Sequence, residues 1–225
     1  MDRRAVHIRL ERDLLHELDE LANAEHLDRA AYEGAPCSAA VREAPESYGG
    51  GEADVVSGIA GLREQFRPDR VTWLFVGESS PAGRTHFYRA NSNLFRATQE
   101  AFAQALGDQV PTGPAFLHDF RDRGCWLVDL ADRPVNRLPG RPRKDAVDAG
   151  VDALVRLIAE VRPQRIVTVK ASITSAVRTA AAAAGFEGSV AELPFPVRQW
   201  RSHYVRDLVA LLRESESRRQ DTLPV

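Results

Sequence analysis

The sequence predicts an α/β protein of three layers, in which helices flank a four-stranded, mainly parallel sheet. Two observations predict it: short apolar runs without strict alternation, typical of strands covered on both faces, and helical patterns that separate these runs. Strands that alternate with helices form parallel crossovers and an open sheet. The predicted strands are 71–76, 125–130, 165–169 and 188–193. The predicted helices are 91–106, 114–123, 145–161, 172–184 and 202–213.

Local signals support these elements in turn. The strands read VTWLFV, CWLVDL, RIVTV and GSVAEL, and each is mostly apolar. Gly107, Gly124 and Gly185 follow three of the helices, at the position where a helix end favours glycine. The last helix runs into the polar sequence ESESRRQDTLPV, so we expect residues 214–225 to form a flexible tail.

Residues 1–50 are predicted to form a separate N-terminal extension. The segment AVHIRLERDLLHELDELA is similar to the strand and first helix of a ribbon-helix-helix DNA-binding module, which would pair two chains into a homodimer. Gly34 and Pro36 interrupt the second helix of such a module, so a simple amphipathic extension is the alternative. The Gly-rich stretch 45–53 separates the extension from a main domain at 55–213.

Composition excludes several classes of protein. The chain has 225 residues, of which 44% are hydrophobic and 28% charged, as in a folded globular protein. No apolar run approaches the roughly 18 residues of a membrane span, and the charged N-terminus lacks a signal-peptide core. We therefore expect a cytoplasmic protein without a membrane partner. Cys37 and Cys125 are too few for a four-thiolate zinc site or an iron–sulfur cluster, so no metal or other cofactor is expected.

Two basic segments suggest DNA as the partner, although the formal net charge is −2. The segment 133–144 (RPVNRLPGRPRK) contains basic residues and no acid. The segment VRQWRSHYVR places Arg198, Arg201 and Arg206 beside Trp200. Clustered arginines with an aromatic neighbour predict local contact with a phosphate backbone.

Polar or basic residues follow all four predicted strands. Glu78 lies in the loop GESSPAG after the first strand, Asp129 at the end of the second and Lys170 at the end of the third. The fourth strand leads into the rigid sequence LPFP and the segment that contains Trp200. Ligands of open α/β sheets bind beyond the carboxyl ends of the strands. The sequence therefore predicts a functional site at this edge.

The same residues carry a resemblance to a known family. The stretch VGESSPAGRTHFYRANSNLF resembles the first motif of the uracil-DNA glycosylase superfamily, closest to the branch with VGEAPG…GxPFVGxAGxLL. Gly77 and Glu78 match its Gly-Glu, and Phe87 falls on its base-stacking Phe. The segments CWLVDLADRPVNR, RPQRIVTVKASITSAV and LPFPVRQWRSHY are similar to its later motifs. Over about residues 70–213, the resemblance implies a glycosylase-like fold that acts on a base flipped out of DNA.

Three departures from the family bear on the chemistry. The four cluster-binding cysteines of this branch are missing. Leu193 replaces the family's His, which stabilises negative charge on the departing uracil, and Asp129 replaces the Asn whose amide binds the base. A carboxylate only accepts hydrogen bonds, so it suits the amino group of cytosine better than O4 of uracil. One proton shared with cytosine N3 would complete the pair. Asp129 therefore suggests cytosine or a modified cytosine; a structural Asp that caps its loop is the alternative.

The resemblance also implies roles for the remaining candidates. Glu78 would orient the attacking water or stabilise positive charge on the sugar; the alternative is a carboxylate that ties down its own loop. Phe87 would stack on the flipped base or simply pack in the core. The base-binding candidates are Gly77, Phe87 and Asp129. The DNA-binding candidates are Arg198, Trp200, Arg201 and Lys170, with Trp200 as a wedge in the base stack; ordinary surface positions are the alternative.

Two functional hypotheses follow. The first is a monofunctional DNA glycosylase, which hydrolyses the N-glycosidic bond of a modified or mispaired base in base-excision repair or in defence against phage DNA. The second is a catalytically inactive DNA-binding protein that retains the glycosylase fold. Leu193 and the likeness of the N-terminal segment to a DNA-binding module favour the second hypothesis.

Overall fold

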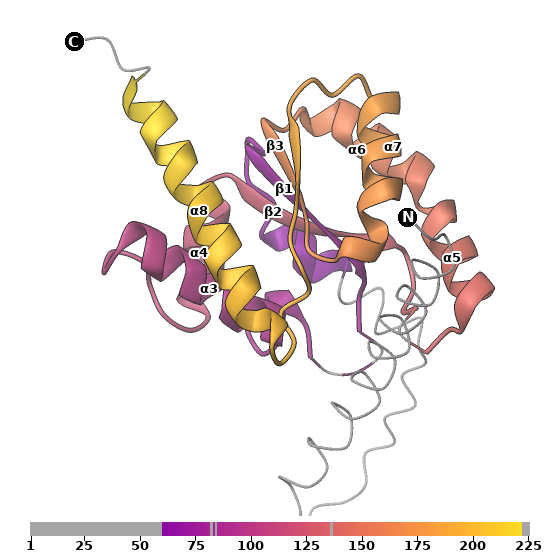
Figure 1. Ribbon diagram of the computed structural model, residues 1–225, viewed down its shortest axis with the longest axis horizontal. Helices are drawn as coiled ribbons and strands as arrows, with labels where there is room; N and C mark the ends of the chain where they lie inside the picture. Colours follow the sequence, from indigo (N-terminus) through magenta and orange to yellow (C-terminus); the bar gives the residue numbers. More distant parts are fainter. Residues whose placement is uncertain (1–59, 82, 84, 136, 222–225) are drawn as a thin grey trace, which may run out of the picture. The chain divides into compact units, whose positions relative to one another are not determined.

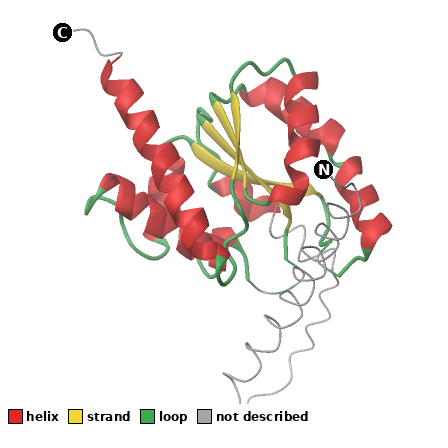
Figure 2. Ribbon diagram, in the orientation of Figure 1, coloured by secondary structure: helices red, strands yellow, loops and turns green. Residues whose placement is uncertain are grey.

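The computed structural model describes residues 60–81, 83, 85–135 and 137–221. These residues confirm the α/β class: a four-stranded sheet lies between two groups of helices (Figure 1, Figure 2). The predicted N-terminal extension, its likeness to a ribbon-helix-helix module and the homodimer proposed through it lie outside the described residues. So does the boundary near residue 50.

The sheet is parallel throughout, where the sequence predicted a mainly parallel one. Its order is β2-β1-β3-β4, and each neighbouring pair is parallel. The strands are β1 (Trp73–Ser79), β2 (Cys125–Ala131), β3 (Arg165–Thr168) and β4 (Ser189–Glu192). Strand β1 extends three residues beyond its predicted end. Gly77 and Glu78 therefore belong to the sheet itself, and Gly77 pairs with Asp129 across β1 and β2.

The helices cover both faces of the sheet. Figure 1 shows α3, α4 and α8 on one side and α5, α6 and α7 on the other. Their bounds are α3 (Asn93–Leu106), α4 (Ala115–Asp122), α5 (Gly140–Ala149), α6 (Val151–Val161), α7 (Thr174–Ala183) and α8 (Trp200–Asp221). Short 3-10 helices occupy Phe87–Arg89 and Ala171–Ile173.

Aromatic rings hold α3 and α4 against the sheet. Phe75 of β1 packs on Phe120 of α4 with ring centres 5.3 Å apart, and Phe116 of α4 packs on Phe95 and Phe102 of α3. All five rings are buried. Tilted and edge-to-face rings stabilise a core beyond the area they bury. This layer fixes the loops on that face of the sheet.

Two helices differ from the sequence prediction. The helix expected at 145–161 is divided into α5 and α6 at Gly150, where a Cβ atom would overlap the carbonyl oxygen of Leu130. A close approach of the chain to β2 therefore decides the break. Helix α8 continues to Asp221, so part of the expected tail is helical. Glu214 in that part pairs with Arg165 at 3.5 Å and with Arg218 one turn later.

Candidate functional site

The carboxyl ends of all four strands meet at one edge of the sheet, because the strands are parallel. Glu78 of β1 and Asp129 of β2 lie on adjacent strands, and Lys170 follows β3 on the other side of β1. The loop after β4 leads from the same edge into α8. Three of the predicted site residues are thus brought together by the fold.

Glu78 is held between two cations. Arg143 of α5 donates from Nε to Oε1 at 2.8 Å and from Nη2 to Oε2 at 2.6 Å, and Lys170 Nζ donates to Oε2 at 3.0 Å. The side chains of Glu78, Lys170 and Arg143 are only 11%, 15% and 20% exposed. This group is called the Glu78 triad below. A two-pronged arginine contact fixes the plane of the carboxylate as well as its position.

The triad keeps Glu78 ionised. Burial by itself would raise the pKa of Glu78, but the hydrogen bond from Arg143 and the charges of Lys170 and Arg143 outweigh it, so the pKa lies below its usual value. An ionised carboxylate accepts about four hydrogen bonds, of which the two cations supply three. Because its pKa is lowered, Glu78 is a weak base, and its carboxylate can accept one further hydrogen bond.

The pKa of Asp129 shifts in the opposite direction. Burial raises its pKa, and the negative charge of Glu78 raises it further, while a hydrogen bond from Ser80 and the charge of Arg63 oppose the shift. Ser80 Oγ donates to Oδ2 at 2.8 Å. Oδ1 packs against Gly77, where a Cβ atom would lie 2.7 Å from it. Gly77 thus leaves the space that the Asp129 carboxyl group occupies.

Phe87 lies in the aromatic core rather than on an open surface. It is 4% exposed and packs against Phe95 and Phe120, with ring centres 5.8 and 5.2 Å away. This placement favours the packing interpretation, and its stacking on a base stays a prediction. The neighbouring Tyr88 hydroxyl donates to the carbonyl of Leu127 and accepts from the N–H of Leu127. It thus provides hydrogen-bond partners for both backbone groups of Leu127 in β2.

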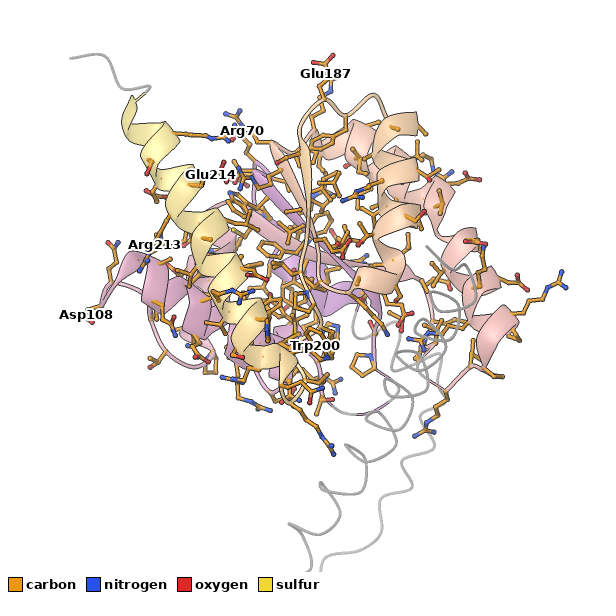
Figure 3. The ribbon with its side chains drawn as sticks, in the orientation of Figure 1. Arg70, Asp108, Glu187, Trp200, Arg213 and Glu214 are labelled. Carbon is orange, nitrogen blue, oxygen red and sulfur yellow. The ribbon has the colours of Figure 1, made fainter. Side chains whose placement is uncertain are left out.

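The loop after β4 and the first turn of α8 each expose one large hydrophobic ring. Phe195 is 37% exposed and Trp200, at the first turn of α8 (Figure 3), is 43% exposed. They are the two exposed large hydrophobic side chains among the described residues. Between them the exposed Arg198 has a φ of 41°, in the left-handed region. Arg201, a predicted DNA contact, pairs instead with Glu100 of α3 at 2.6 Å.

Leu193, which follows β4, has no hydrogen-bond donor in its side chain. Its side chain is buried, and its N–H donates to the carbonyl of Thr168 at 2.8 Å. His203 lies on α8, where it is exposed and contacts the carbonyl of Gln199 at 3.2 Å. The side chain of Leu193 therefore offers no hydrogen bond at this edge, and the ring of His203 packs beside that of Trp200 with ring centres 5.4 Å apart.

Sequence reasoning missed two polar residues of the site. Arg143 belongs to the predicted basic segment 133–144, but nothing in the sequence indicated that it turns inward to Glu78. Ser80 stands in the loop GESSPAG without any pattern that links it to Asp129. Phe195 was also missed, although an aromatic residue between two prolines in LPFP is a signal for a rigid, exposed ring.

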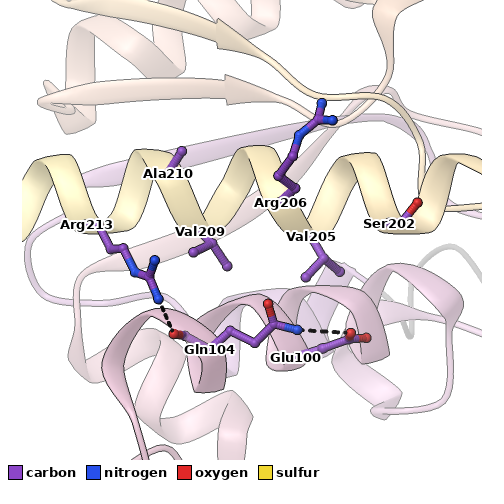
Figure 4. A pocket seen from close by; sticks show the side chains of 8 residues that line it. All are labelled: Glu100, Gln104, Ser202, Val205, Arg206, Val209, Ala210 and Arg213. Carbon is purple, nitrogen blue, oxygen red and sulfur yellow. Dashed lines mark hydrogen bonds between the residues drawn. The ribbon is translucent and has the colours of Figure 1, made fainter.

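Two cavities lie away from this edge. One of about 510 Å³ opens between α3 and α8 (Figure 4), with an apolar floor and a rim that includes Glu100 and Arg213. Another of about 570 Å³ adjoins the loops that precede β1 and β2, and is lined by residues such as Arg70 and Gly124. Neither cavity includes a predicted site residue.

Comparison with models of known protein families and with curated proteins finds no match for this chain. Within the described residues, no group of three or more His, Cys, Asp or Glu side chains is placed to hold a metal ion. None of the helices in that part of the chain is long and apolar enough to cross a membrane.

Proposed function

We propose that this protein is a monofunctional DNA glycosylase, which flips a modified or mispaired base out of DNA and hydrolyses its N-glycosidic bond with water. The observation that carries the proposal is the pair of unlike carboxyl groups at the carboxyl edge of the sheet. Glu78 is held ionised, whereas Asp129 has a raised pKa. Two carboxyl groups with pKa values pushed apart are typical of glycosidic bond cleavage. The resemblance of Gly77 and Glu78 to the Gly-Glu of uracil-DNA glycosylases supports the same assignment.

In this proposal Glu78 orients the attacking water. Three of its hydrogen-bonding positions are filled by Arg143 and Lys170, and the fourth accepts a hydrogen from the water. A carboxylate with a low pKa does not take the proton away in the ground state, but it fixes the water's direction of attack. The triad carries one more positive than negative charge, so Lys170 also suits a contact with a DNA phosphate.

The loop after β4 holds the opened DNA. Trp200 and Phe195 present rings to solvent beside Arg198, and exposed aromatic rings next to a cation suit insertion into a base stack. Arg201 contributes only after its ion pair with Glu100 opens. The proposed setting is base-excision repair or defence against phage DNA, in the cytoplasm.

The test is the formation of abasic sites. The protein is incubated with DNA from several sources, including phage DNA with modified cytosines, and abasic sites are revealed by alkaline cleavage. We expect cleavage with the wild type and at least about tenfold less with Glu78→Gln, since oriented water and charge are lost. Glu192→Gln is the matched control, because Glu192 is exposed at the end of β4. Equal activity of the wild type and Glu78→Gln would exclude Glu78 from the reaction.

A second candidate is a DNA-binding protein without catalytic activity. The observation that favours it is Leu193, whose buried side chain and occupied N–H offer a departing anionic base no hydrogen bond. Salt-sensitive binding of duplex DNA, together with no abasic site in any DNA, would favour this candidate over the enzyme.

A further inference from the structure

The carboxyl group of Asp129 has a restricted geometry at the end of β2. Ser80 occupies Oδ2 with a hydrogen bond of 2.8 Å, and Oδ1 lies over Gly77, which has no side chain. Among the described residues, the Ser80 hydroxyl is the partner that fixes the carboxyl plane. Each carboxyl oxygen has two hydrogen-bonding positions, so Oδ2 keeps one beside Ser80 and can face one edge of a flat ring together with Oδ1.

Burial favours a proton on the Asp129 carboxyl group, and the charges around it act in both directions. The charged groups that act on its carboxyl group are Glu78 from β1 and Arg63 from the helical residues 60–65. Tyr88 also faces it, but its hydroxyl is neutral, because burial raises its pKa far above the usual value. Burial is the main reason that the pKa of Asp129 is raised, and the ionised Glu78 adds to the rise while Arg63 and the hydrogen bond from Ser80 oppose it, so a proton is stabilised at Asp129.

The residue after β4 favours one kind of base over another. A base that departs as an anion is stabilised by a hydrogen-bond donor at its oxygen, and the side chain of Leu193 supplies none. A base that receives a proton on its ring nitrogen departs as a neutral molecule and needs no such donor. Uracil belongs to the first kind, since its N3 already bears a hydrogen. Cytosine belongs to the second, since its N3 has a lone pair next to an amino group.

We propose that Asp129 selects a cytosine-type base, accepting from its exocyclic amino group and giving its own proton to the adjacent ring nitrogen. This inference rests on the proposed glycosylase function. The bond between N1 and C1′ breaks with its electron pair on N1, and the base leaves as a neutral tautomer. Water adds to C1′ and releases one proton to solvent, from which Asp129 recovers a proton. Hydrolysis thus consumes one water and no other reactant.

The experiment measures single-turnover base release from matched oligonucleotides that carry cytosine, 5-methylcytosine or uracil at one position. Rates are taken from pH 5 to pH 9, conditions in which thermal melting shows each protein to be folded. The wild type should release the amino-bearing bases, and the rate should fall as pH rises through the raised pKa of Asp129 and its proton is lost. Asp129→Asn should lose this pH inflection and shift the cytosine-to-uracil ratio toward uracil by on the order of 10- to 100-fold.

Two further variants separate this role from a structural one. Ser80→Ala removes the hydrogen bond that stabilises the ionised carboxyl group, so the inflection should move to higher pH. Asp132→Asn is the matched control, because Asp132 is exposed just beyond β2, and it should keep the wild-type ratio and profile. An unchanged inflection in Ser80→Ala would argue against Asp129 as the proton donor.

The outcomes are distinguishable from failure of the proposed function. Robust uracil release by the wild type, or an unchanged substrate ratio in Asp129→Asn, would overturn the cytosine assignment while leaving a glycosylase. The absence of abasic sites with every oligonucleotide would overturn the proposed function and this inference with it.

Discussion

Replacing Glu78 by Gln should destabilise the protein as well as slow it. The substitution keeps the size of the side chain but removes the charge between Arg143 and Lys170. The amide NH2 group of Gln also cannot accept the hydrogen bonds that Arg143 and Lys170 donate. The two cations then face each other with their side chains only 20% and 15% exposed. Water compensates such poorly exposed charges less than it would at the surface.

The size of the effect follows from the burial of the triad. Exposed ion pairs contribute about 0–1 kcal/mol, whereas removing one partner of a fully buried pair costs about 3–5 kcal/mol. The Glu78 triad is mostly covered but reaches solvent, so we expect a loss of about 2 kcal/mol at pH 7. For a domain of this size that corresponds to a decrease in Tm of roughly 4–8 °C.

Urea unfolding at pH 7 measures this loss, with Glu192→Gln as the surface control, which should change the free energy of unfolding by less than about 0.5 kcal/mol. Lys170→Met in the Glu78→Gln background removes the repulsion between the two cations, so the double variant should be more stable than additivity predicts.

The stability that Glu78 contributes should depend on pH. Folding lowers the pKa of Glu78, so this contribution is complete above the pKa of an unfolded Glu and is lost as pH falls through the lowered pKa of the folded protein. A Glu78→Gln variant as stable as the wild type would show that the ion pairs of Glu78 with Arg143 and Lys170 do not stabilise the fold.

Three other predictions concern the proposed DNA-binding loop and a buried histidine. Trp200→Ala and Phe195→Ala should slow base release from duplexes more than from single strands, because a wedge acts only where a stack must open; equal losses on both substrates in single-turnover assays would contradict it. Arg198→Ala should weaken binding to all duplexes and lower the salt slope by about one, whereas Arg156→Ala, exposed on α6, should leave the slope unchanged in titrations at several salt concentrations. Burial, with help from nearby arginines, lowers the pKa of His86 to about 4, so the unfolded chain binds a proton more readily. As pH falls from 7 to 4, the wild type should therefore lose about 3 kcal/mol more of its free energy of unfolding than His86→Gln does, as measured by urea unfolding at each pH. An equal loss in the two proteins would argue against a buried neutral ring.

Several features of the site were predictable from the sequence. The ends of β1, β2 and β3 carry Glu78, Asp129 and Lys170 in order along the chain, and the alternation of strands and helices predicts that these ends share one edge. This inference needs only local periodicity and the geometry of parallel crossovers. It does not need the identity of any distant contact.

The partners of these residues were not predictable, because they depend on packing between distant segments. Arg143 and Glu78 are 65 residues apart in the sequence, and Lys170 and Glu78 are 92 residues apart. The exposed or buried state of Phe87 likewise depends on where α3 and α4 pack their rings, which hydrophobic periodicity does not specify.

The sequence by itself determined the α/β class, the approximate strands and the placement of Glu78, Asp129 and Lys170 at the carboxyl edge, because each follows from the local pattern of apolar residues. Only the tertiary structure decided that β1 lies between β2 and β3, and with it the pairing of Gly77 with Asp129. It also decided the direction in which the pKa of each carboxyl group shifts. A pKa depends on the burial, hydrogen bonds and charges around a group; at Glu78 the partners Arg143 and Lys170 outweigh burial, and at Asp129 burial outweighs Ser80 and Arg63.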